Sequence, residues 1–163
     1  KGGVSSTLLD TYESERLPHV RTFIDLAVRL GAVLQETDPE AARARDARFA
    51  AGAEMFDYPQ PQLGPGCRAD DAPPVGTIFP QPRLADGRLM DEAIGQRFAV
   101  VGDAALLENL QTDAVLLPEV GLDWLAGHKK RAAVLRPDRY VFAVANDRAE
   151  LVDAIAALPV RPV

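Results

Sequence analysis

The sequence predicts an α/β fold in which a helical N-terminal arm precedes a small sheet domain. Apolar residues recur at helical spacing before residue 57, prolines and glycines gather in the middle of the chain, and short β-rich apolar runs alternate with helical segments after residue 90. We therefore expect three regions, a helical arm over residues 1–57, a connector over 58–90 and an α/β domain over 91–163.

The composition is that of a folded protein. With 163 residues, 47% of them hydrophobic, the chain can bury the core of one compact domain but not of two full-sized ones. A net charge of −6 disfavours nucleic acid and anionic lipid as partners. No apolar run approaches the about 20 residues that span a bilayer, and no leader-like segment is present, so we expect a cytoplasmic location. The first residue is Lys1 rather than Met, which indicates a tag remnant or a fragment of a longer protein.

The first part of the arm has the pattern of one long helix with an interruption. Apolar residues recur at helical spacing over residues 5–34, and Ser5 or Ser6 can cap the start. Pro18 cannot donate an amide hydrogen bond and crowds the preceding turn. We therefore expect a kink or a break near residues 16–18.

The arm ends in a second helix and leads into the connector. Asp38 followed by Pro39 has the pattern of an N-cap and a first-turn proline, and the helix should run to about Ala53. Residues 58–87 then hold more than half of the chain's 13 prolines. Such a segment should be extended and lie against another surface, which could belong to a part of the protein outside this chain.

The last part of the chain alternates between strand and helix patterns. A right-handed crossover should join the first two strands, a turn at residues 136–139 should form a hairpin between the last two, and Asn146 or Asp147 should cap the final helix. This order is that of a thioredoxin-like α/β sandwich. The expected strands are 97–101, 114–117, 132–135 and 140–144, and the expected helices are 104–110, 122–128 and 147–158.

The redox chemistry of such a fold is not expected here. It needs a Cys-x-x-Cys pair where the first strand meets the first helix, because the helix N-terminus lowers the thiol pKa. That position is occupied by Gly102-Asp103-Ala104-Ala105, so the sandwich lacks the CxxC motif. Cys67, the single cysteine, lies in the connector and is interpreted as inert.

No other cluster of side chains predicts a catalytic, cofactor or metal site. We interpret the two histidines as surface or helix-end residues, the single tryptophan as core and the loop carboxylates as solvated, and the Gly-Pro-Gly run lacks the flanking strand and helix that a phosphate site needs. We therefore assign no catalytic, cofactor-binding or metal-binding residue. The residues weighed and set aside are His19, His128, Trp124, Asp70, Asp71, Asp86 and 64–66.

Three segments nevertheless resemble a known family. Residues 8–18 (LLDTYESERLP), 76–82 (GTIFPQP) and 136–141 (RPDRYV) are similar, in this order, to segments in the C-terminal third of the class A flavoprotein monooxygenases. The resemblance is strongest to the 3-(3-hydroxyphenyl)propionate hydroxylase group and its phenol hydroxylase relatives. It implies a parent enzyme that binds FAD, is reduced by NADH or NADPH, and inserts one oxygen atom of O2 into a phenolic ring.

The resemblance also implies what this chain does not contain. The family's flavin-binding motifs would lie upstream of Lys1, so we expect a non-catalytic fragment whose partner is the missing FAD-binding portion, with a homodimer as a further possibility. In the family picture the helix over residues 12–16 packs on the core, where its glutamates (Glu13, Glu15) and Arg16 could form buried or interfacial ion pairs; the alternative is an exposed helical pair that adds little stability. The alternative function is an autonomous, redox-inactive thioredoxin-like domain for binding or scaffolding.

Overall fold

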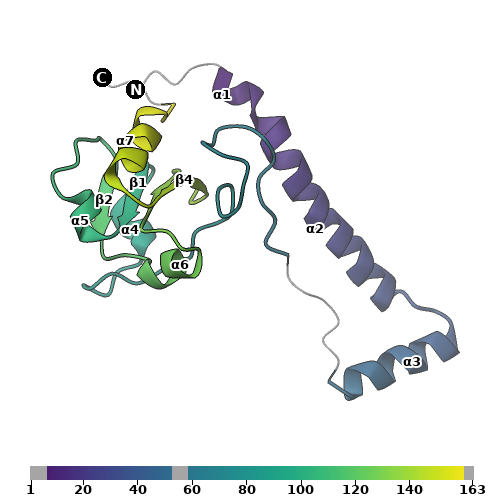
Figure 1. The fold of residues 1–163 in the computed structure, drawn as a ribbon. Coiled ribbons are helices and arrows are strands. Elements are labelled where there is room, and N and C mark those ends of the chain that lie inside the picture. The colour runs from purple at the N-terminus through teal and green to yellow at the C-terminus, as the bar shows by residue number, and fades with distance from the viewer. Residues whose placement is uncertain (1–6, 53–58, 160–163) are drawn as a thin grey trace.

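The computed structural model describes residues 7–52 and 59–159. The predicted cap at Ser5 or Ser6 and the predicted boundary near residue 57 lie outside these residues. Figure 1 shows a helical arm that extends away from a sheet covered by helices on both faces. The elements in chain order are α1 (Thr7–Asp10), α2 (Tyr12–Leu34), α3 (Pro39–Ala50), α4 (Met90–Ile94), β1 (Ala99–Gly102), α5 (Ala104–Leu107), β2 (Val115–Pro118), α6 (Leu122–Gly127), β3 (Ala132–Leu135), β4 (Val141–Ala145) and α7 (Arg148–Ala156).

Of the predicted kink or break near residues 16–18, the break is wrong, because α2 continues through Pro18 to Leu34. The interruption lies earlier, at Thr11 between α1 and α2. Proline leaves the carbonyl four residues before it without an amide partner inside the helix. That carbonyl belongs to Ser14. The connector packs against this turn at Gly64, whose amide donates to the next carbonyl, that of Glu15, at 2.9 Å. A tertiary contact is thus present beside the turn that local sequence would interrupt.

The start of α3 follows the predicted capping pattern. The Asp38 carboxylate accepts hydrogen bonds from the amides of Glu40 and Ala41 at 2.7 and 3.2 Å, and Pro39 occupies the first turn. No side chain of α3 is buried. None of the described helices is both long and apolar enough to cross a membrane.

The four-stranded sheet has the order β2-β1-β3-β4. β1 and β2 are parallel, with Val100 opposite Leu116, whereas β3 runs antiparallel to both β1 and β4. The hairpin between β3 and β4 closes as predicted, because the Arg139 amide donates to the Arg136 carbonyl at 2.9 Å. The predicted α/β class is confirmed, as is the predicted order of strands and helices along the chain from β1 to α7.

Two differences concern short helices. α5 ends at Leu107 instead of continuing to residue 110, and Asn109 adopts a left-handed backbone conformation with φ 53°. α4 was not predicted, although Met90 and Ile94 are fully buried. A single helical turn is too short to show a periodic pattern in sequence.

Side chains of alternating strand positions form a core on each face of the sheet. One face lies under α5 and α7, where Val100, Val134 and Phe142 pack with Leu151. The other face lies under α4, α6 and the connector. Its members are Val75, Phe79, Met90, Ile94, Ala99, Val101, Leu125, Ala133, Leu135 and Val141.

The connector covers the outer edge of β4, which would otherwise expose unpaired backbone groups. The Ala69 amide donates to the Phe142 carbonyl at 2.9 Å, and the Gly76 amide donates to the Val141 carbonyl at 2.8 Å. The Val141 amide in turn donates a hydrogen bond to the Thr77 carbonyl at 2.9 Å. The extended connector therefore lies, as far as it is described, against this chain's own sheet and α2.

Candidate functional site

Three parts of the chain that are far apart in the sequence lie together in the structure. The start of α2, the connector and the β3–β4 hairpin meet where the arm contacts the sheet. We call this meeting point the junction and define it by four charged side chains, those of Glu15, Arg16, Arg136 and Asp138.

Glu15 lies at the centre of the junction with only 3% of its surface exposed. Its carboxylate accepts a bond from the Arg136 guanidinium at 2.9 Å, one from the Thr11 hydroxyl at 3.2 Å and one from the Cys67 amide. Burial alone would raise the pKa of this carboxyl, but the hydrogen bonds from Arg136 and the Cys67 amide outweigh it and hold the pKa below its ordinary value of 4.5. Glu15 is therefore an ionised, fully satisfied carboxylate.

Arg136 connects the hairpin to the arm and to the connector. Its guanidinium also donates to the Cys67 carbonyl at 3.0 Å and makes two bonds of 3.1 Å to Asp138. Burial would lower the pKa of Arg136, but Glu15 and Asp138 keep it above its ordinary value. One side chain thereby links all three segments.

A second set of contacts extends the junction along α2. Arg16 pairs with Asp138 at 2.5 Å, and its guanidinium lies 5.0 Å from the centre of the Tyr140 ring. The Tyr140 hydroxyl lies 2.7 Å from Nε2 of His19. Burial, followed by the positive charge of Arg16, lowers the pKa of His19 below 6.5, which favours the neutral imidazole.

Two glycines allow the connector to approach α2 this closely. A Cβ atom at Gly64 would lie 1.9 Å from the Ser14 carbonyl oxygen, and one at Gly66 would lie 2.2 Å from Cγ of Glu15. Either contact is far shorter than van der Waals contact. The junction therefore requires glycine at both positions.

The junction has the properties of a structural contact. Each of its two carboxylates is already paired with an arginine, whereas a general acid or base must be within reach of a substrate proton. Cys67 lies beside the junction, and burial raises the pKa of its thiol, which disfavours the reactive thiolate.

The position where a thioredoxin would hold its redox pair contains charged caps instead. The Asp103 carboxylate accepts from the Ala105 amide at 2.9 Å and pairs with Arg131 at 2.5 Å. The Glu119 carboxylate accepts from the Ala104 amide at 2.9 Å. Both free amides at the start of α5 are thus occupied by carboxylates.

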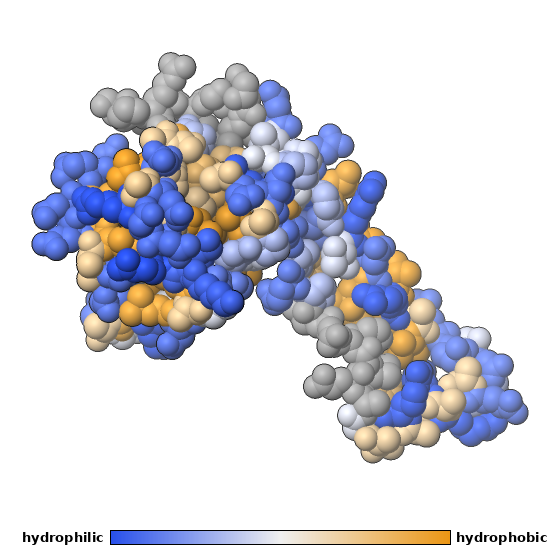
Figure 2. All heavy atoms as spheres, in the orientation of Figure 1, coloured by the Kyte–Doolittle hydropathy of each residue, from blue (hydrophilic) through white to orange (hydrophobic). Residues whose placement is uncertain are grey.

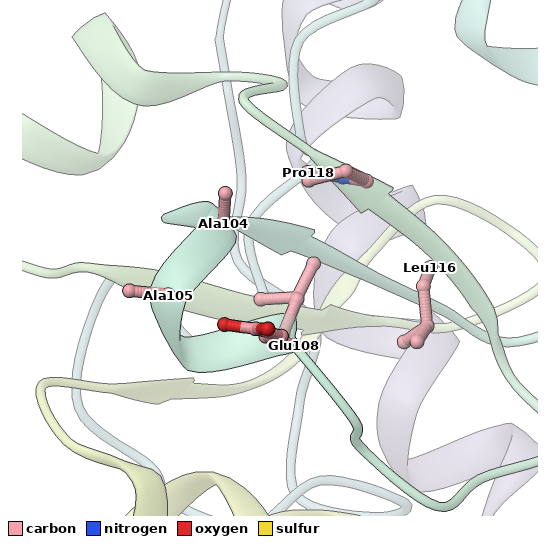
Figure 3. Close-up of a pocket in the computed structure, with 6 residues that line it drawn as sticks. Ala104, Ala105, Glu108, Leu116 and Pro118 are labelled. Atoms are coloured by element: carbon pink, nitrogen blue, oxygen red, sulfur yellow. The ribbon is translucent and has the colours of Figure 1, made fainter.

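An open depression of about 450 Å³ lies between α5 and the edge strand β2. Figure 3 shows the Glu108 carboxylate as the acidic side chain among apolar ones. Ala104 and Ala105, which lie at the position of the absent Cys-x-x-Cys pair, are among its lining residues. The lining residues are Ala104, Ala105, Leu107, Glu108, Leu116 and Pro118.

The other residues weighed in the sequence lie apart from the junction. Asp71 pairs with Arg68 at 2.7 Å, and the Asp86 carboxylate pairs with a neighbouring arginine. Trp124 is half-buried against Phe79, with ring centres 4.7 Å apart. Within residues 7–52 and 59–159 no three His, Cys, Asp or Glu side chains form a group that could hold a metal ion.

Of the two alternatives left open for Glu15 and Arg16, the interfacial ion pairs are confirmed, and the partners are Arg136 and Asp138. The contact of His19 with Tyr140 was not predicted. The sequence does contain a signal for this contact surface, because Glu15, Arg16 and His19 lie on one side of a helix. A single sequence does not show which distant strand packs against that side.

Comparison with curated proteins finds relatives among flavoprotein hydroxylases. The chain is 32% identical to a probable NADH-specific resorcinol 4-hydroxylase of Rhodococcus jostii (strain RHA1), with 98% of this chain and 37% of that protein covered. It is 33% identical to a 3-(3-hydroxy-phenyl)propionate/3-hydroxycinnamic acid hydroxylase of Mycolicibacterium smegmatis, with 86% and 34% covered. The chain thus spans little more than a third of the length of these relatives. No family model matches it.

Solved structures with the same fold include a flavin-dependent monooxygenase. RebC-10x with bound 7-carboxy-K252c has a TM-score of 0.63 at 19% identity, covering 96% of this chain and 37% of that one. The flavin-dependent monooxygenase PieE, in complex with FAD and substrate, has a TM-score of 0.58 at 19% identity, covering 95% and 40%. OxyS anhydrotetracycline hydroxylase from Streptomyces rimosus has a TM-score of 0.56 at 24% identity, covering 98% and 37%. At these sequence identities the comparison shows a similar fold and nothing more.

Proposed function

The chain is a C-terminal part of the FAD-dependent aromatic-ring hydroxylases, and from this premise we propose that its parent is a cytoplasmic monooxygenase that hydroxylates phenolic compounds with NAD(P)H and O2. The names of the sequence relatives, a resorcinol hydroxylase and a hydroxyphenylpropionate hydroxylase, support this substrate class. Within the parent, residues 1–57, 58–90 and 91–163 would act as arm, connector and C-terminal domain.

The turn from β1 to α5 does not fit the phosphates of a flavin dinucleotide. A dinucleotide needs free amides at a strand-to-helix turn for its phosphates. At the turn from β1 to α5, carboxylates of Asp103 and Glu119 already accept from the amides and would repel a phosphate. We infer that residues outside this chain bind FAD, and we derive no catalytic step here.

The role of this chain within the parent is structural. The observation that carries this proposal is the junction, in which Arg136 binds Glu15 of α2, the Cys67 carbonyl of the connector and Asp138 of its own hairpin. Buried ion pairs of this kind tolerate little displacement, because an unpaired buried charge is costly. The junction would therefore fix α2 in one orientation on the sheet.

The test is a titration of FAD fluorescence with the 163-residue chain and, in parallel, with the protein extended upstream to the length of its relatives. We expect quenching and phenol-dependent NAD(P)H oxidation only with the extended protein. Micromolar FAD binding by the 163-residue chain would contradict the structural role. An extended protein that binds no flavin would contradict the hydroxylase proposal and favour an autonomous binding or scaffold domain.

A further inference from the structure

The two edges of the sheet differ in how they are covered. The connector lies along the outer edge of β4, whereas no strand within residues 7–52 and 59–159 pairs with the outer side of β2. An unpaired edge strand can accept a further strand from another polypeptide. β2 is therefore the open edge of this sheet.

The open edge offers a short, well-defined set of backbone groups. The Val115 amide donates to the Phe98 carbonyl at 2.9 Å, and the Glu119 amide is likewise bonded to β1. Because the backbone groups of successive strand residues point to alternate sides, the amide and the carbonyl of Leu116 point away from β1. Pro118, two residues further along, has no amide to donate. Leu116 is thus the position of β2 that can both donate to and accept from an added strand.

A place for side chains lies directly beside this edge. The depression of about 450 Å³ is lined by Leu116 and Pro118 of β2 and by residues of α5. Figure 3 shows Glu108 on the α5 side of the depression and Leu116 on the β2 side. In Figure 2 apolar side chains, in orange, are visible among hydrophilic ones on the side of the sheet domain where Figure 1 labels α5 and β2. Among the described lining residues Glu108 is the charged one, and none is a lysine or an arginine.

We propose that β2 and the depression form a docking groove for a short extended segment of another polypeptide, which pairs with the backbone of Leu116 and carries an apolar and a basic side chain two residues apart. Side chains two residues apart on a strand lie on one face, about 7 Å from each other. The apolar side chain would fill the depression over Leu116, and the basic one would reach the Glu108 carboxylate. Backbone bonds would supply affinity and the two side chains specificity. The groove is independent of the activity proposed for the parent.

The charge of the groove favours such a segment over a second copy of the chain. Antiparallel pairing of two β2 strands would place both α5 helices on one face of the joined sheet, each with its Glu108. The described lining residues supply no counter-charge for two carboxylates, and like charges across paired strands are destabilising. A basic side chain from a different polypeptide removes this conflict.

A nuclear magnetic resonance titration of the isotope-labelled 163-residue chain tests the proposal. The probe is the end-blocked peptide Thr-Ile-Thr-Lys-Thr-Tyr, and the comparison peptide has glutamate in place of lysine. We expect saturable shifts at residues 104–108 and 114–118, with the Leu116 amide proton moving downfield as it gains a hydrogen bond. The glutamate peptide should bind at least about fivefold more weakly.

Two variants of the chain test the role of the carboxylate. Glu108→Gln should weaken binding of the lysine peptide about three- to fivefold. Glu92→Gln is the matched control, because Glu92 is an exposed carboxylate on α4, which covers the opposite face of the sheet. This control should leave the affinity unchanged. An equal affinity of the Glu108→Gln variant and the native chain would overturn the assignment of Glu108.

Two N-methylated forms of the lysine peptide test the backbone pairing. One blocks the amides of Ile and Lys, and the other blocks those of the two inner threonines. One form should lose at least about tenfold in affinity, because only alternate amides of an added strand face β2. Undiminished binding of both forms, or the absence of saturation at millimolar peptide, would overturn the proposal. A doubled mass of the free chain in sedimentation, with Leu116 protected from amide exchange, would overturn it in favour of a second copy.

Discussion

Replacing Arg136 by methionine should destabilise the chain strongly, because it leaves the Glu15 carboxylate buried without its counter-ion. Glu15 is 3% exposed and keeps two weaker partners, the Thr11 hydroxyl and the Cys67 amide. Breaking one side of a buried ion pair costs about 3–5 kcal/mol, and the remaining bonds favour the lower end, about 3 kcal/mol. Glu15→Gln keeps the acceptor and removes the charge, so its cost should be about 1 kcal/mol.

The double variant Glu15→Gln/Arg136→Met should cost about 2 kcal/mol, less than Arg136→Met alone, because the neutral amide tolerates the missing guanidinium. The free energies of unfolding come from urea titrations followed by far-UV circular dichroism at pH 7. Arg88→Met is the control, since Arg88 forms an exposed pair with Asp86, and should leave the unfolding curve unchanged. An Arg136→Met effect as small as that control, or additivity of the two junction substitutions, would refute the reasoning.

The same pair should show a pH dependence of defined sign. The pKa of Glu15 in the folded chain lies below 4.5, so its ionised form stabilises the fold. This contribution is fully present above the unfolded pKa of about 4.3 and is lost as the pH falls through the folded value. The stability difference between the native chain and Glu15→Gln should therefore narrow below about pH 4.3 and stay constant from pH 5 to 7.

Three further results are expected. Gly64→Ala should destabilise the chain by about 2 kcal/mol or more through overlap with the α2 backbone, whereas Gly31→Ala, which meets no atom within 4 Å, should stabilise it by about 0.5–1 kcal/mol in thermal unfolding. The Cys67 thiol, whose pKa is raised by burial, should react slowly with iodoacetamide at pH 7 and faster in urea, and equal rates would argue against its burial. Arg16→Gln should raise the pKa of His19 toward 6.5 in an NMR titration. An unchanged pKa would show that the charge of Arg16 does not influence the protonation of the imidazole.

The helical arm shows which structural features local sequence rules can predict. Asp38 and Pro39 begin α3 as predicted, because an N-cap carboxylate and a first-turn proline act within one turn of the chain. Pro18 does not break α2, and the connector packs against this part of the helix, where the Gly64 amide donates to the Glu15 carbonyl. A contact between positions that far apart in the sequence is not visible in a local pattern.

By itself, the sequence determined the α/β class, the order of strands and helices along the chain, and the β3–β4 hairpin. It also determined that no Cys-x-x-Cys pair lies at the β1–α5 turn. Periodicity, turn residues and residue identity are local properties and can be read from the sequence. Its three family-like segments also indicated the flavoprotein hydroxylases. Only the tertiary structure decided that the start of α2, connector residues 64–67 and the β3–β4 hairpin converge, that Glu15 pairs with Arg136 and Arg16 with Asp138, and that the connector covers β4. The physical reason is that a buried charge selects its partner through the packing of distant elements, and one sequence does not encode that packing in any local pattern.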